Sequence, residues 1–421
     1  MRYLAEVNPP TPEFDRLAPH AELTFMPLEA VWADGRHDAS RVKVKSEVMT
    51  GYTRFRDGDI LLPKVAPTFQ AGRVARVHGL IRGVGAGTTE LHVLRARPGV
   101  DPRYVAYALR SKHFIEEGVT AFQGVAGLQR VPDRFVSDFK VAELPLDEQV
   151  RIANFLDAET ARLDRLIDLR QRQMAAVEER SSAWVDRLVR EGVGHTEFDE
   201  ARFKPLARVP RVWRQARLRN VPCEVQTGPF GSQLHAEEYV VGGWPVINPA
   251  NIQGIGLVAD PNMTVDDFTR ARLIRHILRA GDVVFGRRGE LGRAGLVGPR
   301  EEGWLCGTGS LRVRFCGQDF VPGYLAHYLR IAALRHYFLS QSVGSTMDNL
   351  NTQILLRMPI LIPPLREQVD IAAACDWALD RGRLTGDALR RSIDLLRDRR
   401  AALIAAAVTG HLDVTTARGV A

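Results

Sequence analysis

One short signature occurs twice in this 421-residue chain. The segment PLDEQVRIANFLD starts at Pro145, and PLREQVDIAAACD starts at Pro364, 219 positions later. A period longer than half the chain is too long for a solenoid repeat. It predicts the duplication of a whole domain together with the segment that follows it. Other segments of the chain should then also occur twice, in the same order and at a similar offset.

Further elements repeat at nearly the same offset, between 219 and 223 positions. GDILLPKV from Gly58 corresponds to GDVVFGRRG from Gly281, and GTTELHVL from Gly87 corresponds to GTGSLRVR from Gly307. Each of these segments is typical of a glycine turn leading into a strand. VDPRYVAYALRS and FVPGYLAHYLRI are both typical of a helix that starts at a proline. AGLQRVPDRFVSDFKVAELPL faces MDNLNTQILLRMPILIPPL. The repeat predicts approximate pseudo-two-fold symmetry.

A long helix is expected after each copy of the signature. In the first, apolar residues recur from Leu163 to Leu188 at alternate intervals of four and three residues, which is the spacing of a heptad seam, with polar interruptions at Arg170 and Ser181. A helix of about 40 residues spans roughly 60 Å, so two such helices would most simply pack on each other. The alternative is that each helix lies only on the core of its own domain. The predicted seam consists of Leu163, Ile167, Met174, Val177, Trp184 and Leu188 on the first helix, and Leu389, Ile393, Leu396 and Leu403 on the second.

Length and pattern together predict a mixed α/β (α+β) protein with two globular domains, separated by two long antiparallel coiled-coil helices. A chain of 421 residues suits two to three domains at ~100 to 200 residues each. The expected ranges are 1–145 for the first domain, 146–192 for the central helix, 193–362 for the second domain, and 363–421 for the last helix and tail.

Composition narrows the partners and the compartment. The net charge of +7 fits a nucleic-acid partner, although many proteins that bind none share it. The four cysteines form no C-x-x-C pair, so neither a disulfide framework nor a zinc site is predicted. We find no leader sequence and no apolar run of ~18 residues, so we expect a cytoplasmic protein without a membrane partner.

The order of these segments, with the terminal LIAAAVTGHLDV from Leu403 to Val414, resembles the specificity subunit of type I restriction-modification systems. The resemblance implies two target-recognition domains, each reading one half of a split double-stranded DNA sequence. It also implies that the long helices dock modification (methyltransferase) subunits, with restriction (endonuclease) subunits as further partners. The chain itself would be non-catalytic. S-adenosylmethionine, Mg²⁺ and ATP are then expected only on partner subunits.

Weaker patterns suggest other functions. Asn8-Pro9-Pro10-Thr11 is similar to the N-P-P-[YF] loop of adenine methyltransferases, but Thr11 cannot stack on a flipped base. Pro132-Asp133 followed by Asp138-Phe139-Lys140 matches a nuclease pattern, but the second copy holds no acid at the corresponding place. A standalone methyltransferase or nuclease therefore remains an alternative, as does a coiled-coil adaptor that binds only protein.

The candidate DNA contacts lie mainly in glycine-rich loops, where the backbone can approach a groove closely. Arginine suits guanine, and amide side chains suit adenine. The basic run between Arg202 and Arg219 could neutralise phosphates or form a solvated linker. The predicted contacts are Lys64, Thr68, Gln70 and Arg73 in the first copy, and Gln226, Gln233, Asn248, Asn251, Gln253, Arg287, Arg288 and Arg293 in the second.

Overall fold

The computed structural model describes residues 1–125, 129–230, 233–288, 292–317, 319–342 and 350–414. The chain forms two compact units: unit 1 is Met1–Gln173 with Ala388–Ala421, and unit 2 is Met174–Asp387. Two long helices contribute to both units, α6 (Leu146–Glu191) and α11 (Leu365–Val408). Each unit thus consists of one globular domain and one part of each long helix. The four-range division expected from the sequence stays a prediction about recognition and docking.

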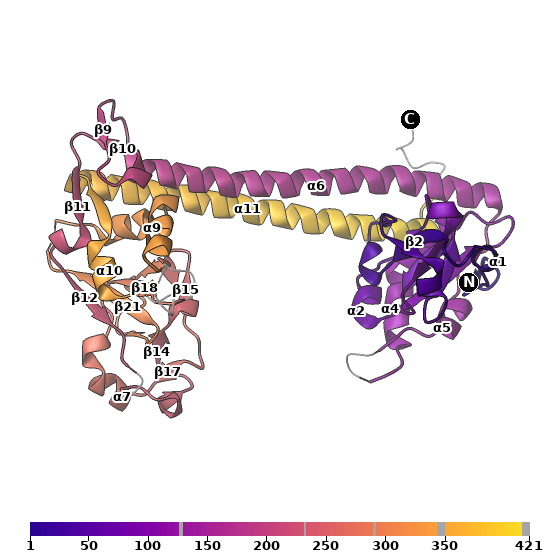
Figure 1. Cartoon of the computed structure of the whole chain (residues 1–421), viewed down its shortest axis with the longest axis horizontal. Coiled ribbons are helices and arrows are strands. Elements are labelled where there is room, and N and C mark those ends of the chain that lie inside the picture. Colours follow the sequence, from indigo (N-terminus) through magenta and orange to yellow (C-terminus); the bar gives the residue numbers. More distant parts are fainter. Residues whose placement is uncertain (126–128, 231–232, 289–291, 318, 343–349, 415–421) are drawn as a thin grey trace. The chain divides into compact units, whose positions relative to one another are not determined.

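The globular part of unit 1 is built on two four-stranded sheets (Figure 1). In the first, all neighbouring strands are antiparallel, in the order β1 (Ala5–Val7), β8 (Leu91–Ala96), β5 (Ile60–Pro63) and β6 (Ala75–Arg76). In the second, the order is β3 (Val42–Val44), β2 (Glu22–Met26), β7 (Val84–Gly87) and β4 (Thr53–Arg56), with β2 and β7 parallel. The helices are α1 (Pro12–Asp15), α2 (Ala66–Gln70), α3 (Pro102–Arg110), α4 (Lys112–Thr120) and α5 (Asp133–Asp138).

Unit 2 repeats the strand order of the antiparallel sheet. Its antiparallel sheet has the order β12 (Cys223–Thr227), β21 (Ser310–Phe315), β18 (Val283–Gly286) and β19 (Ala294–Leu296). Its second sheet has the order β13 (Tyr239–Val240), β17 (Thr264–Val265), β14 (Trp244–Ile247) and β20 (Leu305–Cys306), and again contains one parallel pair. The buried strands β5 and β18, which begin at the repeated Gly-Asp turns, occupy the same place in the two sheets. The duplication expected from the sequence is therefore seen in the strand order of the antiparallel sheets. The second sheets differ, because the parallel pair lies in the middle of the sheet in unit 1 and at its edge in unit 2.

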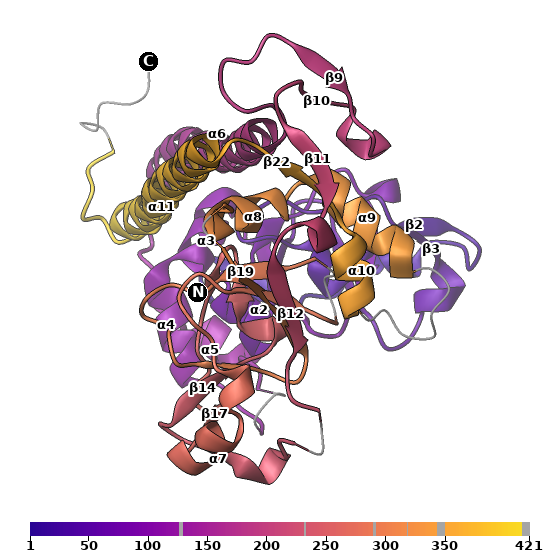
Figure 2. The same cartoon turned by 90° about the vertical axis from the view of Figure 1, so that its left-hand side faces the viewer.

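Unit 2 also has elements outside these sheets. Three two-stranded pairs are β9 (Phe198–Glu200) with β10 (Arg208–Pro210), β11 (Arg214–Arg217) with β22 (Pro359–Ile362), and β15 (Ile252–Gln253) with β16 (Gly256–Leu257). Its helices are α7 (Asp267–Arg272), α8 (Pro322–Tyr328), α9 (Ala332–Ser342) and α10 (Thr352–Arg357). Figure 2 shows α8, α9 and α10 grouped around β11 and β22.

The glutamine of each Pro-Leu-x-Glu-Gln signature is buried and ties a long helix to its domain. In unit 1, Gln149 Oε1 accepts from the Asp101 backbone N at 3.0 Å, and Nε2 donates to the Leu144 carbonyl at 2.7 Å. In unit 2, Gln368 makes the same pair of bonds, from Val321 N at 2.8 Å and to the Pro363 carbonyl at 2.9 Å. These bonds explain why the chain repeats the signature: one amide fixes the start of α3 or α8 beside the start of α6 or α11.

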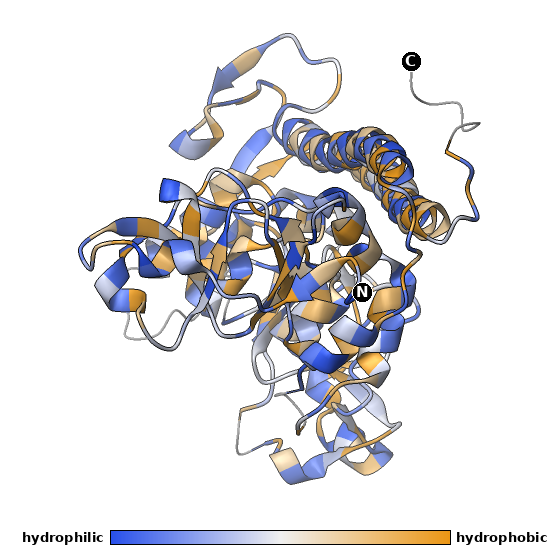
Figure 3. Ribbon diagram, turned by 90° about the vertical axis from the view of Figure 1, so that its right-hand side faces the viewer, coloured by the Kyte–Doolittle hydropathy of each residue, from blue (hydrophilic) through white to orange (hydrophobic). Residues whose placement is uncertain are grey.

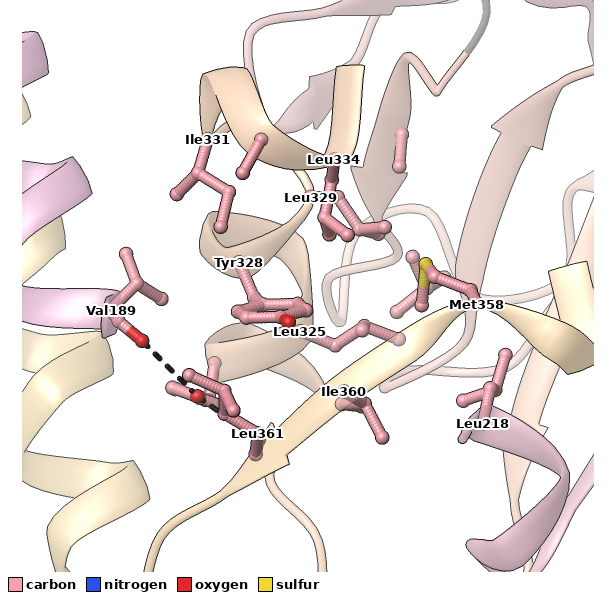
Figure 4. Close-up of a cluster of buried hydrophobic side chains, with 14 of the residues drawn as sticks. Val189, Leu218, Leu325, Tyr328, Leu329, Ile331, Leu334, Met358, Ile360 and Leu361 are labelled. Atoms are coloured by element: carbon pink, nitrogen blue, oxygen red, sulfur yellow. Dashed lines mark hydrogen bonds between the residues drawn. The ribbon is translucent and has the colours of Figure 1, made fainter. Parts of the chain in front are cut away.

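A tyrosine in each unit holds the end of the other long helix. The Tyr104 hydroxyl of α3 lies 3.5 Å from the Val408 carbonyl near the end of α11, and the Tyr324 hydroxyl of α8 lies 3.4 Å from the Val189 carbonyl near the end of α6. Figure 4 shows the second bond as a dashed line at Val189. Burial raises the pKa of Tyr104 to about 12, so the hydroxyl keeps its proton as a donor.

The two long helices run antiparallel within each unit. In unit 1, Ile152 and Leu156 near the start of α6 share a core with Val408 at the end of α11, while Asp164 further along α6 lies 3.5 Å from Arg400. In unit 2 the side chain of Ser181 lies against Gly382, and residues closer to the end of α6 share the core with the first turns of α11. Polar and apolar residues alternate along both helices, as the two colours in Figure 3 show.

The predicted seam is largely buried, with one error. Leu163, Leu188 and Ile393 are buried, whereas Trp184 is 49% exposed and the next residue, Val185, is buried in its place. The less exposed positions around Ser181 are Val177, Ser181, Val185 and Leu188, at intervals of four, four and three residues. The local repeat is therefore eleven residues in three turns. The strict heptad expected from the sequence therefore fails at this point. Six other predicted seam positions are partly buried: Ile167, Met174, Val177, Leu389, Leu396 and Leu403.

The largest core belongs to unit 2. Tyr328 of α8 is fully buried in a cluster with Leu325, Leu329, Leu334, Met358 and Ile360 (Figure 4). Since Val189 and the first turns of α11 join the same cluster, the helix pair is part of this core and not an appendage to it. In the described part of the chain, no helix combines the length and the apolar character needed to cross a membrane.

Candidate nucleic-acid interface

Four loops of unit 2 meet at one edge of its antiparallel sheet. They follow β12, β14 and β18 and precede β21, and we call residues 228–230, 248–251, 286–288 and 307–309 the loop cluster. Backbone hydrogen bonds of 2.9 Å join Gly228 N to the Ser310 carbonyl, Gly307 N to the Ile247 carbonyl, and Arg287 N to the Gly309 carbonyl. Three segments in which the sequence predicted DNA contacts thus come together here.

The loops approach so closely that side chains are excluded at two positions. A Cβ atom on Gly228 would overlap the Gly307 carbonyl, and a Cβ on Gly307 would overlap the side chain of Asn248. Only glycine fits at these contacts, because the backbones of two loops share the space that a side chain would need. The glycine-rich sequence of this region therefore has a packing reason that is independent of any ligand.

Two predicted asparagines lie at the centre of the loop cluster. Asn248 is half-buried, and its Oδ1 accepts from Gly309 N at 3.3 Å. Asn251 is buried, with Oδ1 accepting from Asn248 N and Nδ2 donating to the Val258 carbonyl, each at 2.9 Å. Both ends of the Asn251 amide are occupied within the chain, so this side chain has a structural role, and its expected base contact stays a prediction.

The arginines of the third loop differ in how far their side chains are exposed to solvent. Arg287 is half-buried, and its Nε lies 3.3 Å from the Leu350 carbonyl. Arg288 is exposed beside it. Arg293 lies at the far end of the same segment, where it lines a cleft described below. Arg288 is therefore the predicted arginine that the loop cluster presents most openly to solvent.

The predicted glutamines of unit 2 have similarly different environments. Gln226 Oε1 accepts from Arg312 Nη2 at 2.8 Å, and Gln233 Oε1 accepts from the backbone N of Phe230 at 3.1 Å. Gln253 is exposed at the end of β15. Burial, and then the charge of Arg314, lower the pKa of Arg312, which is 3% exposed. Gln226 therefore helps to satisfy a buried cation, a role that the sequence alone did not reveal.

Unit 1 places Lys64 in the position that Arg287 occupies in unit 2. Lys64 N donates to the Glu90 carbonyl and Val131 N donates to the Lys64 carbonyl, each at 2.9 Å. Arg287 makes the same two backbone bonds, to Gly309 and from Leu350, also at 2.9 Å. The two units thus hold one basic residue each at equivalent, backbone-fixed sites. This is the strongest agreement between the predicted contacts of the two copies.

The other predicted contacts of unit 1 lie just after Lys64. Thr68 donates its hydroxyl to the Val65 carbonyl at 2.9 Å, so it serves the first turn of α2. Gln70, the last residue of α2, is exposed, and Arg73 is half-buried. The charge of Arg73 contributes to a lowered pKa of Glu29, after the backbone hydrogen bond of that carboxylate and its pairing with Arg41.

The residues behind the alternative functions are engaged in the fold. Asn8 Oδ1 accepts from Val93 N at 3.0 Å, and Nδ2 lies 3.3 Å from His92 Nδ1. Burial lowers the pKa of His92, whose Nε2 lies 2.9 Å from the Val131 carbonyl. Asp138 forms ion pairs with Arg2 and Arg134. The same is true of the basic run after Arg202, in which Arg208 pairs with Glu191 and Arg211 with Glu197 and Asp199.

One buried ion pair occurs in both copies and was not predicted. Asp59 of the first Gly-Asp turn bonds Arg95 at 2.8 Å, and Asp282 of the second bonds Arg314 at 2.7 Å. Both aspartates are 1% exposed. The repeated Gly-Asp was visible in the sequence, but its partner arginine lies more than 30 residues further on, and no local rule joins them. The pair anchors the strand that carries Lys64 or Arg287 at its other end.

Comparison with known proteins gives these features a context. Residues 213–378 match the family described as the type I restriction modification DNA specificity domain. The chain is 36% identical over 152 residues to the EcoEI specificity subunit and 38% identical over 154 residues to the EcoAI specificity subunit, both from Escherichia coli. Each match covers 35% of this chain, and the chain spans about a quarter of the length of these relatives.

Solved structures share the fold. A chain from a study of complex assembly in the type I R-M system superposes with a TM-score of 0.73 at 20% identity, covering 94% of this chain and 93% of that one. The HsdS subunit from Thermoanaerobacter tengcongensis gives a TM-score of 0.55, also at 20% identity, covering 97% and 94%. Residues 213–378 are thus similar to a type I restriction modification DNA specificity domain, and the chain as a whole shares its fold with these two solved structures.

Proposed function

We propose that this chain selects the DNA sequence for a type I restriction-modification complex, with the globular part of each unit reading one half of a bipartite target. The observation that carries the proposal is the equivalence of the two copies: Lys64 and Arg287 are fixed by the same backbone bonds, on strands of the same sheet order. Two similar readers in one chain suit a target made of two parts.

Within unit 2 we assign base reading to the loop cluster. Arg288 and Gln253 are exposed there or beside it, and arginine and amide side chains can each make paired hydrogen bonds to a base edge in the major groove. Arg287 and Asn248 stabilise the loops through the hydrogen bonds described above. Their polar groups that make no such bond are available to the DNA. In unit 1 the corresponding candidates are Lys64 and Gln70.

The long helices are proposed to dock methyltransferase subunits. Several large apolar side chains on them remain exposed, among them Trp377 at 67% and Leu384 at 56% on the unit 2 part of α11, and Leu395 at 69% on the unit 1 part. Apolar groups at such positions suit a protein partner better than open solvent. Methyl transfer and cleavage, with S-adenosylmethionine, Mg²⁺ and ATP, are then functions of the methyltransferase and restriction subunits.

A domain exchange tests the proposal. Residues 207–360 are replaced by the corresponding segment of another specificity subunit, and the methylated sites are mapped in cells that also express the methyltransferase subunit. We expect one half of the target to change while the other half is retained. If both halves change together, the two-reader assignment is wrong. Purified chain without partners should transfer no methyl group from labelled S-adenosylmethionine, and transfer would refute the non-catalytic role.

A further inference from the structure

Unit 2 contains an open cleft of about 780 Å³ that is lined by residues outside the loop cluster. Its walls come from the part of α6 between Glu179 and Asp186, the tip of the β15–β16 hairpin at Gly254, and the corner between α8 and α9. The segment Gly292–Ala294, which continues from the loop cluster, forms another side. The cleft is thus next to the proposed base-reading loops and is connected to them by the chain.

Arg330 lies at the corner between α8 and α9 and is half-buried. In the part of the chain that the structure describes, its guanidinium has neither a hydrogen bond nor an ion pair. Burial lowers its pKa, and the neighbouring charge of Arg335 lowers it further. A cation removed from water without a counter-charge is unfavourable, so this position suits an anionic ligand.

The start of α9 adds a second positive feature to the same cleft. The residue before α9 is Ile331, whose side chain cannot accept a hydrogen bond, and Ala332, the first residue of the helix, lines the cleft. In unit 1 the matching helix α4 is capped by Ser111, whose Oγ accepts from Phe114 N at 3.3 Å. Among the residues that the structure describes, no side chain accepts from the first N–H groups of α9, and such N–H groups at a helix start attract anions.

The matching place in unit 1 is crossed by side-chain contacts. Arg110 precedes Arg330 by 220 positions. Its guanidinium lies close to Gly35, as the guanidinium of Arg330 lies close to Gly254. There Arg400 of α11 lies 3.3 Å from the Ala33 carbonyl and 3.5 Å from Asp164, so the loop at Ala33 is joined to the helix pair. At the positions of unit 2 that correspond to Arg400 and Asp164, the chain has a serine and an arginine, Ser181 and Arg383.

The charges around the cleft favour an anion. Arg293, Arg330 and Arg335 line it, opposed by Glu179 and Asp186 on α6. Asp186 is already paired with Arg190, at 2.8 Å from its Nε. Two kinds of anion would suit the cleft: a nucleic-acid phosphate and an acidic segment of a partner protein. Gly286 N, in the loop cluster, donates a hydrogen bond to the Arg293 carbonyl at 2.9 Å, so the cleft begins where the proposed DNA contacts end.

We propose that this cleft binds a phosphate of the DNA backbone beside the half-site read by unit 2, with Arg330 and the start of α9 as the contacting groups. The inference rests on the proposed function. Such a contact would hold the duplex in register and carry no sequence information itself.

The salt dependence of DNA binding tests the inference. Binding of the full-length chain to a target duplex and to a scrambled duplex is measured from low to moderate salt, for the wild type, Arg330→Ala, Glu179→Gln and Arg300→Ala. Loss of one phosphate contact should make the slope of log K against log salt less negative by about 1, equally for both duplexes. Glu179→Gln should strengthen binding to both, because it removes an opposing charge. Arg300 is exposed outside the cleft, so its substitution should have little effect.

The outcomes separate the possible failures. If Arg330→Ala keeps the wild-type slope while the wild type still prefers its target, the phosphate site is wrong and the proposed function stands. If the wild type shows no preference for any duplex that its complex methylates, the proposed function fails. If Arg330→Ala weakens only binding of the methyltransferase subunit, the cleft belongs to an acidic protein segment and the inference is overturned. Should Arg330→Ala fold poorly, Ala183→Glu, at an exposed position lining the cleft, should weaken binding to both duplexes; unchanged binding would overturn the inference.

Discussion

The two units keep the same framework but differ where α3 and α8 meet the long helices. In unit 1, Tyr107 of α3 donates to Asp157 of α6 at 2.7 Å; at the matching place in unit 2, His327 lies 2.8 Å from Asp376 of α11. The glutamine and tyrosine bonds to the long helices are repeated in both units. Three features differ: the contact of Tyr107 or His327, the cap of α4 or α9, and the contact between Arg400 and the loop at Ala33. The bonds that hold a domain to the helices are thus constant, and the surface around them differs.

The helix seam is the feature on which both units depend, and a charge within it should have the largest effect. Ile393 is 4% exposed on the unit 1 part of α11. Ile393→Asp would bury a carboxylate without a partner and should cost about 3 to 5 kcal/mol in the free energy of unfolding. Urea unfolding with a fluorescence or circular-dichroism readout measures the cost.

The neighbouring residue provides the matched control. Asp394 is exposed and forms only a 3.5 Å ion pair with Arg397, so Asp394→Lys should cost about 0 to 1 kcal/mol. Equal, mild effects of the two changes would contradict a buried seam at this part of α11.

The repeated glutamine should be equally important in the two units. Gln149→Leu leaves the Asp101 N–H and the Leu144 carbonyl without partners, and Gln368→Leu does the same to Val321 and Pro363. Each unsatisfied buried group costs about 1 to 3 kcal/mol, so both variants should be clearly destabilised, and by similar amounts. A large loss in one and none in the other would show that the signature has different roles in its two copies.

The sequence was most informative where a pattern is local. The duplication, both long helices and nine of the ten seam positions follow from periodicity, because burial along a helix repeats every three or four residues. Trp184 was misplaced because the helices change from a seven- to an eleven-residue repeat beside Ser181, and a strict heptad extrapolates past that point.

The candidate DNA contacts show the opposite case. Glycine-rich segments predicted which loops matter, and three of them do meet in unit 2. The roles of Asn251 and Gln226 could not be predicted, because their amides bond to Val258 and Arg312, whose proximity depends on the packing of distant strands. The sequence did not predict the position of Arg330, whose guanidinium has no partner among the described residues, for the same reason.

The two glycines of α11 should respond in opposite directions to substitution by alanine. A Cβ on Gly382 would overlap the Ser181 side chain across the seam, whereas nothing lies within 4 Å of a Cβ on Gly386. Gly386→Ala should therefore stabilise the helix by about 1 kcal/mol, the usual difference in helix propensity. In Gly382→Ala the displaced contact should cancel or reverse that gain. Thermal unfolding of the two variants makes the comparison, and a gain of about 1 kcal/mol in both would show that the helices do not need the close approach.

The smallest expected effect concerns how the free energy of unfolding depends on pH. Of the two matching contacts, Tyr107–Asp157 in unit 1 and His327–Asp376 in unit 2, only the second should contribute to this dependence. Burial lowers the pKa of His327, and the bond to Asp376 raises it by less, since the side chain of Asp376 is 56% exposed and its charge is partly screened by water. Folded His327 therefore takes up a proton less readily than unfolded His327, whose pKa is about 6.5. Its contribution to stability is complete above that pH and is lost as the pH falls below it.

His327→Gln keeps a neutral N–H donor for Asp376 at every pH, so the variant should lose less stability than the wild type between pH 7.5 and pH 5.5. His92 and His276, whose pKa values burial also lowers, remain in the variant, so its acid sensitivity is reduced and not abolished. His336→Gln, at an exposed position, should behave as the wild type does. In unit 1, burial raises the pKa of Tyr107 to about 12, and the hydroxyl keeps its proton throughout this range. If urea midpoints of the wild type and His327→Gln fall in parallel between these two pH values, the exchange of tyrosine for histidine has no consequence for stability, and the two contacts are interchangeable.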